Sequence, residues 1–114
     1  MKIQVLIFSI ILVFLTGCSQ TTQTGNPDWI DRLIKKIESD PVGTPPLSIW
    51  RYEYNGQVVY FVPAHCCDIP STLYDADGNV LCSPDGGIKG QGDGRCKGFF
   101  TDRVNEMLIW QDSR

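Results

Sequence analysis

Residues 63–96 read PAHCCDIPSTLYDADGNVLCSPDGGIKGQGDGRC and hold four of the five cysteines and six of the eleven glycines of the chain. A segment with so few apolar side chains cannot be ordered by burial alone. We therefore predict two disulfide bonds within it, formed by Cys66, Cys67, Cys82 and Cys96.

The pairing of these cysteines is only partly suggested by the sequence. Neighbouring side chains on an extended chain point to opposite sides, so Cys66 and Cys67 are expected to bond to different partners, one to Cys82 and the other to Cys96. Four cysteines allow three pairings, which sequence alone does not separate, and one of them contains a strained bond between the neighbours Cys66 and Cys67.

The N-terminus has the pattern of an export signal. Met1-Lys2 is a short positive region, and the apolar run from Ile3 to Leu15 is too short to span a bilayer comfortably. The next residues, LTGC at 15–18, resemble the bacterial lipobox. That resemblance implies cleavage after residue 17 and acylation of the Cys18 thiol by a fatty acid such as palmitate. Ser19 in place of Asp is similar to lipoproteins sent on to the outer membrane.

Composition limits the partners of the exported chain. Removing residues 1–17 removes Lys2 and leaves 9 basic and 13 acidic residues, a net charge near −4. An acidic chain without a basic run is not expected to bind nucleic acid.

Export also places the cysteines in an oxidising compartment, where an even set of four thiols favours disulfides over a metal site. Residues 18–25 are then a lipidated cysteine with a flexible tether, and the membrane is the first expected partner.

Residues 26–114 are predicted to form one α+β domain, a helix packed on a small antiparallel sheet. Asn26 and Pro27 suit a helix start, and an apolar stripe follows at helical spacing, made of Trp29, Ile30, Leu33, Ile34 and Ile37. Two strand-like runs in 47–63 flank Asn55-Gly56, which predicts a type I′ hairpin pairing Trp50 with Phe61 and Tyr52 with Val59. We expect the helix to cover this apolar face and the Arg51–Tyr60 face to be half solvated.

The C-terminal half is predicted to add shorter elements. A second hairpin is expected over residues 72–82, turning at residues 76–79. A helical turn capped by Thr101 is expected after Phe99, and Leu108 to Trp110 are expected to form a last strand, although helix and strand are hard to separate in so short an apolar run.

Few residues could carry chemistry. His65, Asp68 and Asp75 are the candidate ligands of a metal site, which is the main alternative to a purely structural role. The pattern Asp75-x-Asp77-x-Asn79 begins like a calcium loop, but the glycine and glutamate required later are Val80 and Gly86, so a tight turn is favoured. No free thiol or Gly-x-Ser-x-Gly motif is expected, and we predict no enzyme and no cofactor.

The glycine-rich loop from Ser83 to Gly98 is the candidate recognition surface. Lys89, Arg95 and Lys97 are the residues through which it would bind a partner, because exposed loops on rigid scaffolds often carry function. The partner would be an envelope protein or glycan. In a close variant, the loop inhibits an envelope hydrolase.

Several short motifs resemble one family. They are Cys-Cys-Asp at 66–68, Tyr-Asp-x-x-Gly-Asn at 74–79, Cys-x-Pro-Asp-Gly-Gly at 82–87, Gly-x-Gly-Asp-Gly-x-Cys at 90–96 and Trp-x-Asp-x-Arg at 110–114. Over residues 50–114 the chain is similar to small secreted or lipid-anchored bacterial proteins with an uncharacterised domain. The resemblance implies a shared fold and an envelope location, but it assigns no activity. Asp112 and Arg114 are expected to pair with each other or with the glycine-rich loop.

Overall fold

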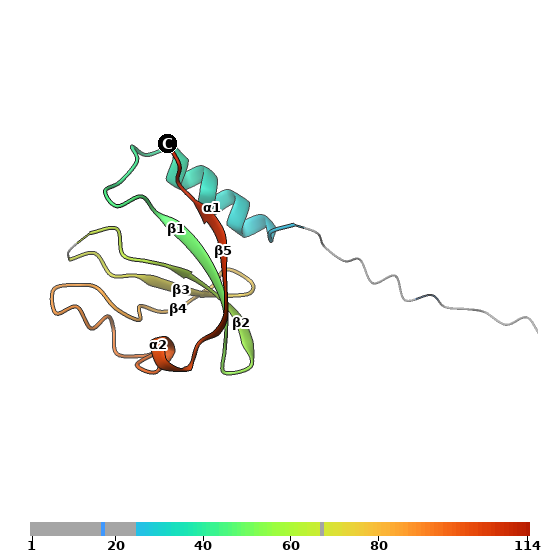
Figure 1. The fold of residues 1–114 in the computed structure, drawn as a ribbon, viewed down its shortest axis with the longest axis vertical. Helices are drawn as coiled ribbons and strands as arrows, with labels where there is room; N and C mark the ends of the chain where they lie inside the picture. The colour runs from blue at the N-terminus through green and yellow to red at the C-terminus, as the bar shows by residue number, and fades with distance from the viewer. Residues whose placement is uncertain (1–16, 18–24, 67) are drawn as a thin grey trace, which may run out of the picture.

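The computed structural model of the protein describes Gly17, residues 25–66 and residues 68–114. A five-stranded antiparallel sheet with the strand order β4-β3-β2-β1-β5 forms its centre (Figure 1). The elements in chain order are α1 Asp28–Glu38, β1 Ser48–Tyr54, β2 Gln57–Val62, β3 Thr72–Asp75, β4 Val80–Cys82, α2 Phe99–Asp102 and β5 Val104–Gln111. The predicted signal peptide, Cys18 and most of the tether lie outside the described residues.

The β1–β2 hairpin has the predicted register. Trp50 pairs with Phe61, Tyr52 with Val59 and Tyr54 with Gln57. Both turn residues have positive φ, 51° at Asn55 and 75° at Gly56, as a type I′ turn requires. The Asn-Gly pair and the alternation of the flanking strands therefore determine this hairpin locally.

The helix packs on the face of this hairpin that was expected to be half solvated. Ile30 of α1 is buried with Ile49 and Tyr60, whereas Tyr52 and Phe61 on the opposite face are buried elsewhere. The prediction was wrong because the Phe61 face is already covered by α2 and by the Cys82–Cys96 disulfide. Two small cores thus lie on the two sides of one sheet.

Trp29 fastens the start of α1 to the second hairpin, which runs through β3 and β4 as predicted. The indole Nε1 donates a hydrogen bond of 2.9 Å to the carbonyl oxygen of Ala76 in the hairpin turn. Its ring lies 5.2 Å from that of Tyr60 and 5.3 Å from that of Tyr74. The expected cap is not formed, because Pro27 takes the cap position and Asn26 makes no capping bond. Aromatic packing therefore fixes this end of the helix.

Gly78 is the residue that lets Trp29 approach the turn. Its φ is +89°, and a Cβ there would lie 2.7 Å from Cδ2 of Trp29. Gly78→Ala should therefore lower the free energy of unfolding by about 1–3 kcal/mol, through backbone strain and loss of the indole contact. Gly56→Ala is the matched control, because its φ is +75° and nothing lies within 4 Å. In urea denaturation, equal losses in the two variants would contradict a Trp29 contact.

Arg114 fastens the other end of α1. Its guanidinium donates hydrogen bonds of 3.0 Å to the backbone carbonyls of Glu38, the last residue of the helix, and of Asp40, two residues beyond it. The same group pairs with the carboxylate of Asp112 at 2.7 Å. Asp112 and Arg114 thus pair with each other, one of the two predicted alternatives, and the arginine also satisfies the helix end.

The pair makes a testable pH prediction. Hydrogen bonds from the Arg114 side chain hold the pKa of Asp112 below its ordinary value. A lowered folded-state pKa means that this stabilisation is complete above the unfolded pKa of about 3.9 and is lost as the pH falls through the folded value. Arg114→Met should raise the pKa of Asp112, measured by NMR titration of its carboxyl carbon. Arg95→Met, the control, should leave it unchanged; an equal rise in both variants would contradict the pairing.

The C-terminal strand is longer and less regular than expected. β5 starts at Val104, and its pairing with β1 shifts register twice, so that Ile109 and Trp110 both contact the α1 core although they are neighbours. These bulges break the alternation that would have identified a strand. The prediction that Thr101 caps the helical turn is wrong. Thr101 lies inside α2, and Gly98 occupies the N-cap position of that helix.

Candidate functional site

The Cys82–Cys96 disulfide closes the base of the glycine-rich loop. Both cysteines are buried, and their Cα atoms are 6.3 Å apart. This bond excludes the expected pairing of Cys66 or Cys67 with Cys82 or Cys96. Cys66 is also disulfide-bonded, and the cysteines left for it in the chain, Cys18 and Cys67, lie outside the described residues. The alternation argument failed because β4 and the returning loop bring Cys82 and Cys96 together beside Phe99.

Backbone hydrogen bonds join the two sides of the loop. The amide of Asp93 donates to the carbonyl of Ser83 at 3.0 Å, and the amide of Gly92 donates to the carbonyl of Gly86 at 3.0 Å. Gly92 has a φ of +63°, and a Cβ on it would collide with the carbonyl oxygen of Ser83. Glycine is therefore required where the two sides come closest.

Ser71 joins the loop to the sheet. Its side chain is buried, and its amide and hydroxyl donate to the carbonyl of Asp85 at 3.0 and 3.1 Å. The hydroxyl also accepts the Asp85 amide at 3.1 Å. Because Ser71 immediately precedes β3, these bonds position the loop relative to the sheet, in addition to the disulfide.

The tip of the loop is a tight turn. The amide of Gly90 donates to the carbonyl of Gly87 at 3.1 Å, which places Ile88 and Lys89 at the centre of the turn. Ile88 is 91% exposed, the most exposed of the large apolar residues in the described part of the chain. Sequence reasoning singled out only the basic residues here and missed Ile88. A lone aliphatic residue within a polar, glycine-rich run was the available signal.

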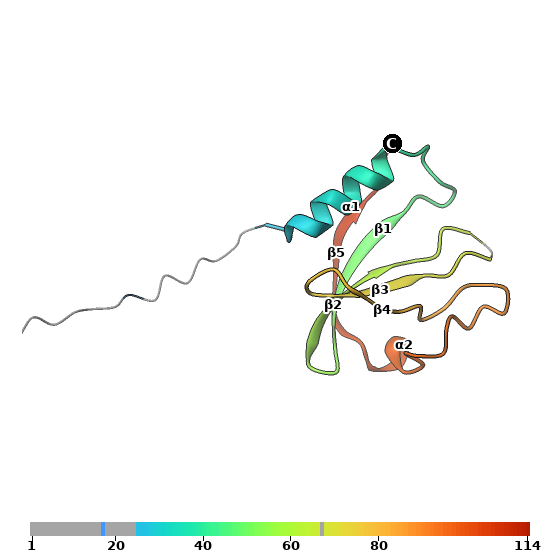
Figure 2. The ribbon, with the colours of Figure 1, turned by 180° about the vertical axis from the view of Figure 1, so that it is seen from behind.

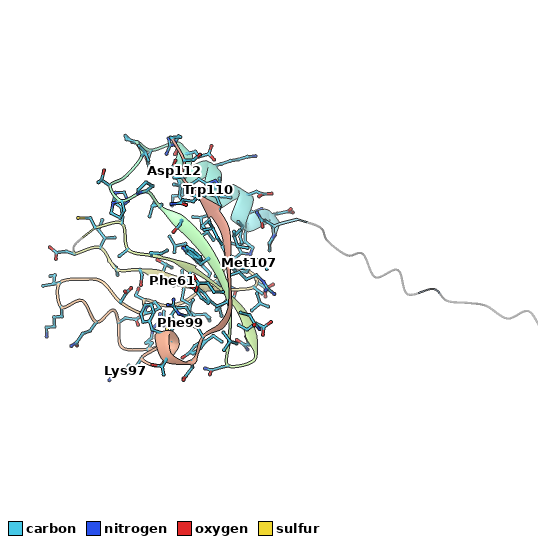
Figure 3. All side chains as sticks on the ribbon, viewed as in Figure 1. Phe61, Lys97, Phe99, Met107, Trp110 and Asp112 are labelled. Atoms are coloured by element: carbon cyan, nitrogen blue, oxygen red, sulfur yellow. A yellow bond between two sulfur atoms is a disulfide. The ribbon has the colours of Figure 1, made fainter. Side chains whose placement is uncertain are left out.

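The three predicted basic residues do not form one cluster. Arg95 is engaged, because its Nε donates to the carboxylate of Asp93 at 2.9 Å, and hydrogen bonds from the Arg95 backbone and side chain keep the pKa of Asp93 below its ordinary value. Lys97 lies at the outer edge of the molecule near α2 (Figure 3) and, with Gln91 and Asp93, lines an open polar depression of about 550 Å³. Lys89 is in the tip turn. Of the three basic residues, only Lys97 lines the depression, whereas Arg95 is paired with Asp93.

The candidate metal ligands are not brought together. His65 lies beside Gly43 near the end of α1, whereas Asp75 precedes the turn that binds Trp29 at the start of that helix. Asp75 accepts hydrogen bonds from the amides of Asp77 and Asn79, each 2.9 Å long, so the calcium-like sequence forms a turn stabilised by its own carboxylate. Within the described ranges, no group of three or more histidine, cysteine or acidic side chains is arranged to hold a metal ion.

Among the described helices, none combines the length and apolar character needed to cross a membrane.

Comparison with known proteins identifies one matching family. No curated protein and no solved structure matches the chain at a significant level. A family model described as a domain of unknown function, DUF6970, matches residues 35–112. This match covers more than half of the chain and includes the whole sheet, the disulfide-closed loop and Asp112, so the protein belongs to the DUF6970 family.

Proposed function

We propose that the protein is a lipid-anchored binding module of the bacterial cell envelope, without catalytic activity, that presents its glycine-rich loop, residues 83–98, to another envelope protein. The observation that supports this proposal most is the tip turn. Backbone hydrogen bonds hold the turn in place, and the side chain of Ile88 is exposed to solvent there, with Lys89 next to it. A partner that covers this apolar side chain removes it from water, which is favourable.

The arrangement of the elements supports presentation away from the anchor. The start of α1 and the glycine-rich loop lie on opposite sides of the molecule in both ribbon views (Figures 1 and 2). A tether that enters α1 from an acylated Cys18 in the outer membrane would therefore leave the loop facing a partner beyond that membrane surface. An aliphatic tip favours an apolar pocket on a protein over the hydroxyl groups of a glycan.

The shape of the tip bears on the alternative of hydrolase inhibition. An extended peptide is the form that binds along a strand edge or a substrate cleft. Ile88 and Lys89 instead occupy a tight turn closed by the bond between Gly90 and Gly87. Recognition of the Ile88 side chain by a pocket is therefore the form of binding that the geometry favours.

Membrane attachment is tested by the acylation site. Cys18→Ala should move the protein from the membrane fraction to the soluble periplasmic fraction, because one thiol carries the proposed anchor. The circular dichroism spectrum and melting temperature of the domain should not change. A variant that stays in the membrane fraction after a high-salt wash would contradict the anchor.

Partner binding is tested by photo-crosslinking in intact cells. A photoreactive amino acid at residue 88 of the lipidated protein should give one defined adduct with an envelope protein. The matched control is residue 107, because Met107 is 52% exposed but lies on β5. Lys89→Glu should reduce the adduct, because it reverses the charge beside Ile88 in the tip turn. Adducts with lipid or glycan only, or equal adducts from both positions, would contradict the proposal.

A further inference from the structure

A second concave site lies between the end of α1, the following linker and His65. Its volume is about 320 Å³, within the range of pockets that bind small molecules. Its walls are largely aliphatic, formed by Leu33, Ile37, Pro41 and Leu47. Polar groups line it at four positions, Lys36, Asp40, His65 and Asp112. It lies apart from the loop and does not depend on the function proposed for the loop.

His65 is placed in this pocket by a glycine. The imidazole occupies the space that a side chain on Gly43 would take, so any larger residue there would displace the ring. The Nδ1 atom of His65 is buried and has no hydrogen-bond partner among the residues that the structure describes. A buried polar atom left without a partner is destabilising, and in a pocket it indicates a group that a ligand can satisfy.

The charges around the pocket favour one kind of ligand. Asp112 is already neutralised, because its carboxylate receives hydrogen bonds of 2.9 and 2.7 Å from Arg114 and its side chain is only 2% exposed. Lys36 has no ion pair among the described residues, and His65 offers a ring nitrogen, while Asp40 carries the remaining negative charge. Asp40 offsets the charge of Lys36, so the pocket has no excess positive charge to bind a phosphate or a dicarboxylate, and a ligand with at most one negative charge is favoured.

We propose that this pocket binds a small aliphatic monocarboxylic acid. The hydrocarbon body lies against the side chains of Leu33, Ile37 and Leu47, and the carboxylate reaches Lys36 and His65. An aliphatic body replaces water at the apolar wall, and a carboxylate paired with an ammonium group forms a charge-assisted hydrogen bond.

Three probes that share one tail separate the contribution of the head group. Octanoate, octanol and octylamine are titrated into the mature chain carrying Cys18→Ala, oxidised, and amide chemical shifts are followed by NMR. Octanoate should saturate and bind about tenfold or more tightly than the other two, the contribution of one hydrogen bond to a charged group. The shifts should be centred on residues 33–47, 65 and 112.

Matched variants assign the binding to named side chains. Lys36→Met should weaken octanoate binding about tenfold or more, whereas Lys35→Met, an exposed neighbour outside the pocket, should not. Gly43→Ala should weaken binding by displacing His65, with retained shift dispersion showing that the domain is folded. No saturable octanoate binding, equal binding of the three probes, tighter binding of octylamine, or equal effects of the two lysine variants would overturn the proposal.

Discussion

Replacing Phe99 by alanine should lower the free energy of unfolding by about 3–5 kcal/mol, the usual range for a buried phenylalanine. Phe99 is 0% exposed, and its ring lies 5.2 to 5.6 Å from the rings of Tyr52, Tyr54, Phe61 and Phe100. It therefore fills the centre of the core on the loop side of the sheet, next to Phe61 (Figure 3). Domains of this size have net stabilities of about 5–15 kcal/mol, so the variant should be close to unfolding.

The neighbouring residue provides the control. Phe100 has the same side chain but is 42% exposed, so Phe100→Ala should cost much less than Phe99→Ala in urea denaturation. Its contacts with Phe61 and Arg103 keep the expected loss above zero. Equal losses in the two variants would mean that Phe99 is not the centre of this core.

Replacing Cys82 by serine should lower the free energy of unfolding by about 3 kcal/mol. The bond to Cys96 spans a sequence separation of 14, and a crosslink of that span restricts the unfolded chain by about this amount. The same variant should make residues 83–96 sensitive to proteases, because the loop has few apolar contacts of its own.

The double variant separates loss of the bond from loss of packing. Cys82→Ser and Cys96→Ser each break the same bond, so combining them should add little to either single loss. Proteins prepared in the oxidised state should be compared by urea denaturation and by limited proteolysis. An unchanged unfolding midpoint in the single variants, or fully additive losses, would contradict a stabilising Cys82–Cys96 crosslink.

Local patterns were sufficient for the two hairpins. Asn55-Gly56 fixes a two-residue turn, and the alternation of β1 and β2 then leaves one register. The face on which α1 packs could not be derived in the same way. It depends on Phe99, which is far along the chain and occupies the face that looked more apolar. The face that carries Arg51 contains charged residues and was therefore expected to be half solvated. Val58, Tyr60 and Val62 on the same face nevertheless provide enough apolar surface for α1 to pack on.

The disulfide pairing and the last strand depended on long-range geometry. Cys82 lies next to Cys96 because the chain returns toward Ser83, where the Asp93 amide donates a hydrogen bond to the Ser83 carbonyl. The spacing of the cysteines in the sequence does not predict this return. In β5 the bulges place Ile109 and Trp110 on one face, so the run lacked the period of a strand. Both cases show tertiary contacts overriding a local rule.

The candidate sites were predictable to different degrees. The loop itself was predicted from its glycines and cysteines, but its apolar tip at Ile88 was not, because the sequence predicted contacts through the basic residues only. The pocket beside His65 could not have been found, since it combines residues from α1, the linker and the C-terminus that only the fold brings together.

Residue-resolved amide hydrogen exchange tests most directly whether residues 83–96 form a rigid presenting loop. In the oxidised protein, the amides of Gly90, Gly92 and Asp93 should be protected by their hydrogen bonds to Gly87, Gly86 and Ser83. Protection should be lost in the Cys82→Ser/Cys96→Ser variant, while the amides of β1 and β2 remain protected. Exchange of these three amides at the rate of an unfolded chain in the oxidised protein would contradict the rigid loop and the function proposed for it.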